Sequence, residues 1–154
     1  MLPTTDISSW TSPQVTCFLD ALQGHTFQRP TIEAMNAQYG FAKSHNAEIL
    51  FRYCEVALAA KDTTIVPVVV RFITTQGRMK FVRPLFRSLY QFQSKVAVDT
   101  FLQHQDFYHP ICSKMIAVDL QIVQRRKQRR QVWLSVGVAA VAASLILVLS
   151  RRRR

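Results

Sequence analysis

The sequence is poor in the residues that build phosphate-binding loops and disulfide frameworks. It contains four glycines and three cysteines in 154 residues. No glycine-rich phosphate loop and no G-x-S-x-G turn occurs, which argues against a nucleotide-binding enzyme or a serine hydrolase. Cys17, Cys54 and Cys112 stand singly among apolar residues with no C-x-x-C pair. This pattern predicts buried thiols in a reducing compartment.

The usual zinc-ligand pattern is missing as well. The four histidines, at positions 25, 45, 104 and 109, all lie outside any H-E-x-x-H stretch. His104 and His109 are separated by five positions and followed by Pro110, so one helical face cannot present both as a ligand pair. The sequence therefore predicts no metal site and no cofactor of its own.

Acidic residues are fewer than basic ones, but the excess of positive charge is concentrated in one part of the chain. The formal net charge is +11, from 20 basic and nine acidic residues. Positions 1–124 hold 11 of the basic residues and all nine acidic ones, so this part is nearly balanced. The remaining basic residues belong to the C-terminal tail, which argues against a nucleic-acid-binding domain. They are Arg125, Arg126, Lys127, Arg129, Arg130, Arg151, Arg152, Arg153 and Arg154.

Between these basic clusters runs an uncharged apolar segment. Residues 132–149 read V-W-L-S-V-G-V-A-A-V-A-A-S-L-I-L-V-L. As a helix it would span about 27 Å, close to the thickness of a bilayer's hydrocarbon core. Trp133 and the flanking arginines suit the two interfaces. We therefore expect a single C-terminal transmembrane helix at 132–149, followed by a basic C-terminus at 150–154.

The position of this segment predicts a tail anchor with the preceding domain in the cytosol. The first ten residues contain Asp6 and no apolar run, so they do not resemble a secretory signal. A short Ala- and Val-rich span with basic flanks favours the mitochondrial outer membrane, and the peroxisomal and endoplasmic reticulum membranes remain alternatives. The polybasic linker 124–131 is expected to contact anionic lipid. Small residues four apart, such as Ala139 and Ala143, leave a homodimer through the span open.

The rest of the chain predicts short helices joined by tight turns, with an all-α fold and no recurring strand alternation. An extension at 1–11 precedes a helical domain at 12–123. Gly24, Gly40 and Gly77 are expected to end helices, Asn46 to cap one, and Pro84 to open one. Antiparallel helices of this length usually stack as pairs or as a solenoid. The expected helices begin near Ser12, Thr31, Asn46, Pro67, Pro84, Ser94 and Ile111.

Three separate blocks carry a family resemblance. They are N-A-E-I-L-F-R-Y (46–53), Q-G-R-M-K-F-V-R-P-L-F (76–86) and Y-H-P-I-C-S-K-M-I-A-V-D-L (108–120). In order and spacing they resemble the C-terminal helical domain of leukotriene A-4 hydrolase and aminopeptidase B, over roughly residues 14–121. The resemblance implies an armadillo-like α-α superhelix. It also implies a structural role for His109, which matches the family's Y-H-P turn. The family's zinc chemistry belongs to a separate catalytic domain, whose motifs this sequence lacks.

The resemblance also gives the G-R-M-K stretch a role. It implies that Arg78 and Lys80 hold the carboxylate of a substrate, because arginine offers a planar fork and lysine a point charge. Both are expected on a turn with their side chains free. Arg83 and Arg87 are interpreted as a solvated helix face. Glu48 and Arg52 are interpreted as a pair that supports only its own helix.

Three functions are compatible with this sequence. The first is a non-catalytic, tail-anchored helical scaffold that binds a protein partner on a cytosol-facing membrane. The alternative is an accessory chain of a zinc aminopeptidase, which supplies the carboxylate clamp to a separate catalytic chain that holds the zinc. RNA binding is the weakest, since the domain is nearly neutral. The first is the primary prediction.

Overall fold

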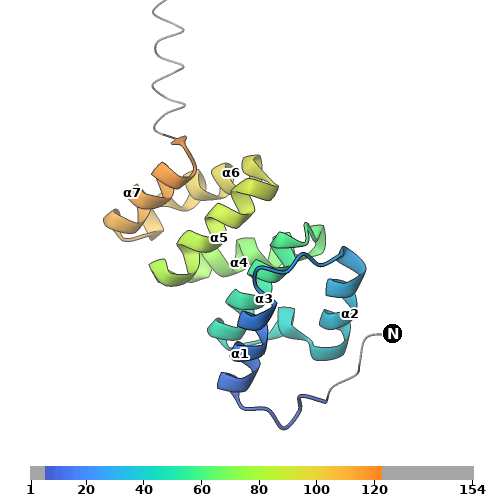
Figure 1. The fold of residues 1–154 in the computed structure, drawn as a ribbon. Helices are drawn as coiled ribbons and strands as arrows, with labels where there is room; N and C mark the ends of the chain where they lie inside the picture. Colours follow the sequence, from blue (N-terminus) through green and yellow to red (C-terminus); the bar gives the residue numbers. More distant parts are fainter. Residues whose placement is uncertain (1–5, 123–154) are drawn as a thin grey trace, which may run out of the picture. The chain divides into compact units, whose positions relative to one another are not determined.

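The computed structural model describes residues 6–122, and every regular element in this range is helical (Figure 1). The predicted all-α class is therefore confirmed, while the armadillo-like superhelix stays a prediction. The α-helices are α1 (Ser12–Leu22), α2 (Arg29–Tyr39), α3 (Ala47–Ala59), α4 (Val66–Thr75), α5 (Met79–Phe92), α6 (Ser94–His104) and α7 (Pro110–Asp119). Short 3₁₀ turns follow α2, α3 and α6, at Phe41–Lys43 (η1), Thr63–Ile65 (η2) and Gln105–Phe107 (η3).

None of the helices within residues 6–122 combines the length and apolar character needed to cross a bilayer. The predicted linker at 124–131, the predicted span at 132–149 and the basic residues on both sides lie outside the described residues. The tail anchor therefore stays a prediction.

Several helix ends follow from side chains and glycine as the sequence predicts. The Asn46 side chain accepts a hydrogen bond from the Glu48 amide at 3.0 Å and caps α3. Gly40 ends α2 in the left-handed conformation, with φ of 66°, which glycine adopts at little cost. His109 Nδ1 accepts from the Ile111 amide at 3.3 Å and caps α7, so its role within the domain is structural. Helix α1 begins at Ser12 as predicted, and its cap residue is Thr11.

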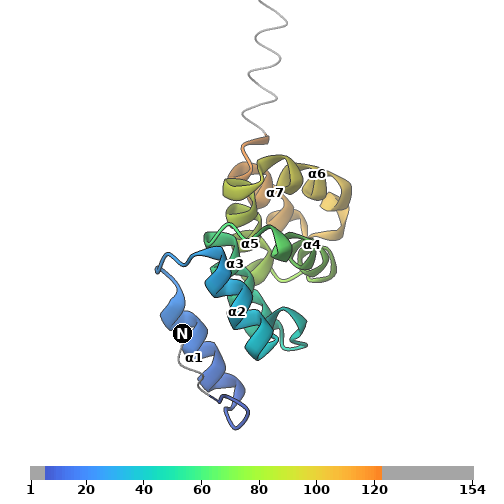
Figure 2. The same ribbon diagram turned by 90° about the vertical axis from the view of Figure 1, so that its right-hand side faces the viewer.

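Helices α3 and α5 form the centre of the domain. Helix α3 packs on α1 and α5, and α5 also packs on α4, α6 and α7 (Figures 1 and 2). Phe86 of α5 meets Phe101 of α6 and Tyr108 before α7, with ring centroids 5.9 and 5.8 Å apart. The Tyr108 hydroxyl donates to the Ile73 carbonyl of α4 at 2.8 Å, so this buried polar group is satisfied.

Pro84 lies inside α5 rather than at its start, which corrects the sequence prediction. The helix begins five residues earlier because Phe81 and Val82 are both buried, at 1% and 0% exposure. An interior proline costs about 3 kcal/mol through its missing amide and its ring. Burying a large apolar side chain contributes about 1.5–3 kcal/mol. Burial of two such residues therefore offsets the proline.

A second correction concerns Arg83 and Arg87, which are not simply a solvated face. Arg83 Nε lies 2.6 Å from Asp119 Oδ2 and Arg83 Nη2 lies 3.3 Å from Asp119 Oδ1. Arg87 Nε lies 3.0 Å from Asp119 Oδ2. The Asp119 side chain is 13% exposed. Sequence periodicity placed both arginines opposite the apolar face of α5, but it could not show that α7 ends beside them.

The Asp119→Asn substitution tests this link between α5 and α7. Burial acts to raise the pKa of Asp119, but the hydrogen bonds and charges of Arg83 and Arg87 outweigh it and hold that pKa below its usual range. We expect a loss of about 1–2 kcal/mol in the free energy of unfolding at neutral pH. Because the folded-state pKa is lowered, the contribution is complete above the ordinary aspartate value, about 3.9, and is lost as the pH falls below it. Urea unfolding across this range measures the difference, with Asp99→Asn on the exposed face of α6 as the control. A difference that persists at low pH would contradict the ion-pair explanation.

Candidate functional site

Phe81 brings the two predicted site cations together. Its ring is 1% exposed. The Arg78 Cζ atom lies 5.5 Å from the ring centroid and the Lys80 Nζ atom lies 5.3 Å from it. Arg78 is the N-terminal cap residue of α5 and Lys80 belongs to its first turn, so only Arg78 precedes the helix. Both side chains are exposed, and the aromatic ring they share holds them near each other through cation–π contacts.

Lys80 is not free, contrary to the sequence prediction. Its ammonium group forms an ion pair with Glu48 Oε1 of α3. The hydrogen bond from Lys80, together with that from Arg52, holds the pKa of Glu48 below its usual range. A carboxylate of the protein itself therefore already contacts the Lys80 ammonium, and a substrate carboxylate would have to share this cation with Glu48.

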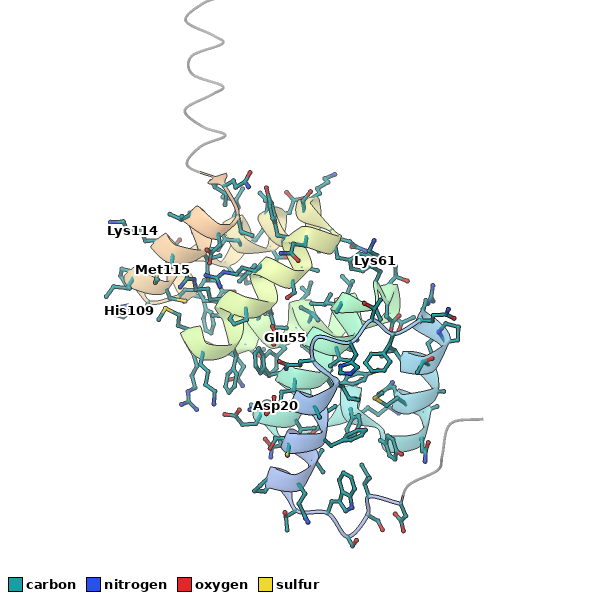
Figure 3. All side chains as sticks on the ribbon, viewed as in Figure 1. Asp20, Glu55, Lys61, His109, Lys114 and Met115 are labelled. Atoms are coloured by element: carbon teal, nitrogen blue, oxygen red, sulfur yellow. The ribbon has the colours of Figure 1, made fainter. Side chains whose placement is uncertain are left out.

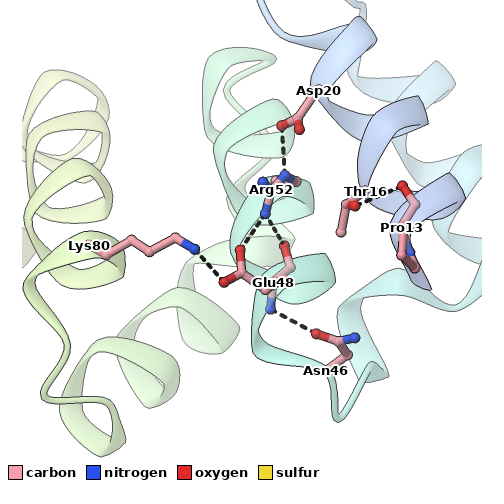
Figure 4. Close-up of polar contacts among 7 residues, drawn as sticks. All are labelled: Pro13, Thr16, Asp20, Asn46, Glu48, Arg52 and Lys80. Carbon is pink, nitrogen blue, oxygen red and sulfur yellow. Dashed lines mark hydrogen bonds and ion pairs between the residues drawn. The ribbon is translucent and has the colours of Figure 1, made fainter.

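The Glu48–Arg52 pair extends beyond its own helix, which is a further correction. Arg52 Nη1 donates to Glu48 Oε2 at 2.6 Å and to the Glu48 carbonyl at 3.1 Å. Arg52 Nε donates to Asp20 Oδ1 of α1 at 2.6 Å. The resulting charge ladder, Asp20–Arg52–Glu48–Lys80, connects α1, α3 and α5 (Figure 4). The i, i+4 spacing identified only its middle pair.

Glu55 lies on α3 beyond the charge ladder, and Figure 3 labels it together with Asp20. Burial raises the pKa of Glu55, while the positive charge of Arg52 opposes this and the negative charge of Asp20 adds to it. The carboxylates near Arg52 therefore differ in character. Glu48 is held ionised by its two cations, whereas burial favours the protonated form of Glu55.

The N-terminal end of α5 carries an unusual charge arrangement. A helix N-terminus is partially positive, so cations there are unfavourable by about 0.3–1 kcal/mol each. Helix α5 nevertheless has Arg78 and Lys80 at this end and no acidic residue in its first turn. Within residues 6–122, Arg78 forms no ion pair, and its guanidinium remains available to a carboxylate. The arrangement suits an incoming anion better than it suits the isolated helix.

The possible metal ligands and the thiols of the described residues can be placed as well. Residues 6–122 contain no group of three or more His, Cys, Asp or Glu side chains placed to hold a metal ion. The zinc that the family resemblance implies has no ligand set among these residues, so we assign it to none of them. Cys54 and Cys112 are buried as predicted, and burial raises the pKa of both thiols. Cys17 is exposed, so its predicted burial was wrong.

The described part of the chain is thus an all-helical domain with two exposed cations on one aromatic ring. The family described as "Leukotriene A4 hydrolase, C-terminal" matches residues 10–120. The chain belongs to this family, as the three sequence blocks predicted.

Individual relatives agree with this assignment. Leucine aminopeptidase 2 of Neurospora crassa is 41% identical over 122 residues, which cover 77% of this chain and 18% of the relative. A leukotriene A-4 hydrolase homolog of Botryotinia fuckeliana is 40% identical over 119 residues, or 76% of this chain and 18% of the relative. The structure of yeast LTA4 hydrolase in complex with bestatin aligns with a TM-score of 0.68 and 32% identity, covering 75% of this chain and 21% of that one. The chain therefore spans about a fifth of the length of these relatives.

The charge ladder predicts an order of stability losses. Arg52 is 19% exposed and serves two carboxylates, so Arg52→Met should lower the free energy of unfolding by about 1–2 kcal/mol. Lys80 is 54% exposed, so Lys80→Met should cost less than about 1 kcal/mol. Urea unfolding followed by circular dichroism measures both, with Lys95→Met as the control for loss of an exposed cation. If Lys80→Met proved as costly as Arg52→Met, the ladder would not be anchored at Arg52.

Proposed function

We propose that this chain supplies the carboxylate-binding helical domain to a zinc aminopeptidase catalytic chain of the same family. The observation that carries the proposal is the pair of cations, Arg78 and Lys80, held over one buried ring at the N-terminal end of α5. This pair would bind the carboxylate end of a peptide. The catalytic chain would supply the zinc and the activated water.

Energetics explain why a second chain is needed. An exposed ion pair contributes about 0–1 kcal/mol, and Lys80 must share its charge between Glu48 and the substrate. Two such contacts give a weak complex, whereas the same contacts in a closed, desolvated cleft are stronger. A catalytic chain that covers the N-terminal end of α5 would provide this environment. The identity of the relatives, which include leucine aminopeptidases, supports the reaction class.

The double substitution Arg78→Ala/Lys80→Ala tests the proposal. Full-length protein is isolated from gently solubilised membranes, its partners are identified by mass spectrometry, and the eluate is assayed for aminopeptidase activity. We expect a zinc aminopeptidase chain with both versions. Because the substitution removes the groups that bind the carboxylate, KM for peptides should rise at least about tenfold, while peptides amidated at their carboxyl end should be affected less.

The matched control is Lys95→Ala/Lys114→Ala, which removes the same charge from α6 and α7. Both residues are exposed, and Lys114 extends outward from α7 (Figure 3). This control should leave KM unchanged. A wild-type eluate with no peptidase chain would contradict the accessory role.

A second candidate is a tail-anchored helical scaffold on the mitochondrial outer membrane, with the helical domain in the cytosol. The observation that favours it is the uncharged run 132–149 between two arginine-rich clusters. The nine tail cations would contact anionic lipid, and the span could pair with a second copy. The two candidates are compatible, because a tethered domain can also serve an enzyme.

The tail itself can be tested apart from the domain. Residues 132–154 fused to a fluorescent protein should reach the mitochondrial outer membrane, because the span is short and its ends are basic. Microscopy with organelle markers and alkaline extraction of membranes provide the measurement. Replacing Arg151 to Arg154 with serine should redirect the fusion toward the endoplasmic reticulum. Localisation of the unaltered fusion to the endoplasmic reticulum would contradict the mitochondrial assignment.

A further inference from the structure

A hollow of about 510 Å³ opens between η1, the start of α3 and the end of α4. Its volume falls within the range of small-ligand sites, about 300–1,000 Å³. Part of its lining is apolar and part is cationic. Ala47, Leu50 and Phe72 supply apolar surface, and Lys43, His45 and Arg71 supply exposed nitrogen-bearing side chains.

The charge around this hollow is one-sided. No aspartate or glutamate lines it. Within residues 6–122, Lys43 and Arg71 form no ion pair with an acidic side chain. Glu48, next to Ala47 in the chain, is already engaged by Lys80 and Arg52. Helix α3 begins at Ala47, and the partial positive charge of its N-terminus adds to that of the side chains.

The hollow lies close to the Arg78 and Lys80 pair but is separate from it. Phe72 lines the hollow, and its ring packs edge-on against Phe81 at a centroid distance of 5.9 Å. Phe81 in turn carries the two cations. The hollow and the cation pair are therefore two anion-attracting places on either side of one aromatic contact.

We propose that this hollow binds an extended peptide segment in which an acidic residue adjoins an apolar one. The apolar side chain would contact Leu50 and Phe72, and the carboxylate would contact Lys43 and Arg71. Inorganic phosphate would be a poorer ligand, because it could pair with the two cations but has no apolar group to contact the apolar lining. This inference goes beyond the proposed function, because it requires neither a catalytic chain nor a free carboxyl terminus.

Binding can be measured with a short fluorescein-labelled peptide that carries a single glutamate between leucines and is amidated at its carboxyl end, so that it offers the protein one carboxylate. Full-length protein in neutral lipid nanodiscs is titrated at physiological ionic strength, and fluorescence anisotropy reports binding. Two charge contacts of up to about 1 kcal/mol each predict about tenfold tighter binding than for the glutamine counterpart. Inorganic phosphate should compete poorly.

Three variants separate this site from other cationic surfaces. Lys43→Ser/Arg71→Gln should weaken binding about tenfold, for the same two contacts. Arg78→Ala/Lys80→Ala should leave it unchanged, because the amidated peptide has no terminal carboxylate. Lys95→Ser/Lys114→Gln removes equal charge elsewhere and should also have no effect. Failure of the proposed function would therefore leave this result standing, and the reverse holds too.

A photo-crosslinking version locates the peptide directly. With one leucine replaced by benzoylphenylalanine, crosslinks should fall within residues 42–50 and 71–76. Equal losses in the Lys43/Arg71 and Lys95/Lys114 variants would show binding by net charge alone and overturn the proposal. Crosslinks confined to the basic tail, or equal affinity for the glutamine peptide, would overturn it as well.

Discussion

The burial of Phe81 is the constraint on which the arrangement around the cation pair depends. Its ring packs on Phe51 of α3 at 5.3 Å and on Phe72 of α4 at 5.9 Å, so one residue joins three helices. Burial of Phe81 and Val82 starts α5 at Met79 despite the interior Pro84. That starting point sets where Arg78 and Lys80 project. The same ring supports one wall of the hollow through Phe72.

The charges around Arg78 and Lys80 destabilise the N-terminal end of α5. Two cations at the N-terminal end of α5 oppose the helix dipole, and Glu48 only partly neutralises them. Glu48 is itself held by Arg52, which Asp20 anchors from α1. Side chains from α1 and α3 thus help to orient Lys80, which is an exposed residue of α5. Local conflicts of this kind, supported from elsewhere in the fold, are typical of binding sites rather than of structural surfaces.

Sequence reasoning succeeded where a signal was local and failed where it depended on packing. Asn46, Gly40 and His109 act at helix ends through their own side chains or backbone, so their roles could be read directly. The prediction that Pro84 opens a helix was wrong because the burial of Phe81 and Val82 in the domain core stabilises the helical turn that precedes the proline. The prediction of a solvated face for Arg83 and Arg87 failed because Asp119, 36 and 32 positions later in the chain, meets them from α7. The hollow has no sequence motif, because its two cations, Lys43 of η1 and Arg71 of α4, lie 28 positions apart in the chain.

Neither the hollow nor the pair of Arg78 and Lys80 would bind a carboxylate tightly by itself, but one ligand that contacted both would bind more tightly. Exposed ion pairs contribute about 0–1 kcal/mol each. If both proposals hold, a ligand that engages the hollow through an internal acidic residue would hold its carboxyl terminus at a high effective concentration near Arg78 and Lys80. Linked contacts of this type raise affinity by about 10²–10⁴-fold without any new interaction, provided that the linker spans the two places. Phe72, which lines the hollow, and Phe81, which contacts the two cations, have ring centroids 5.9 Å apart. Selection for acidic residues near a peptide's carboxyl end would then follow from the positions of four cations rather than from a deep pocket.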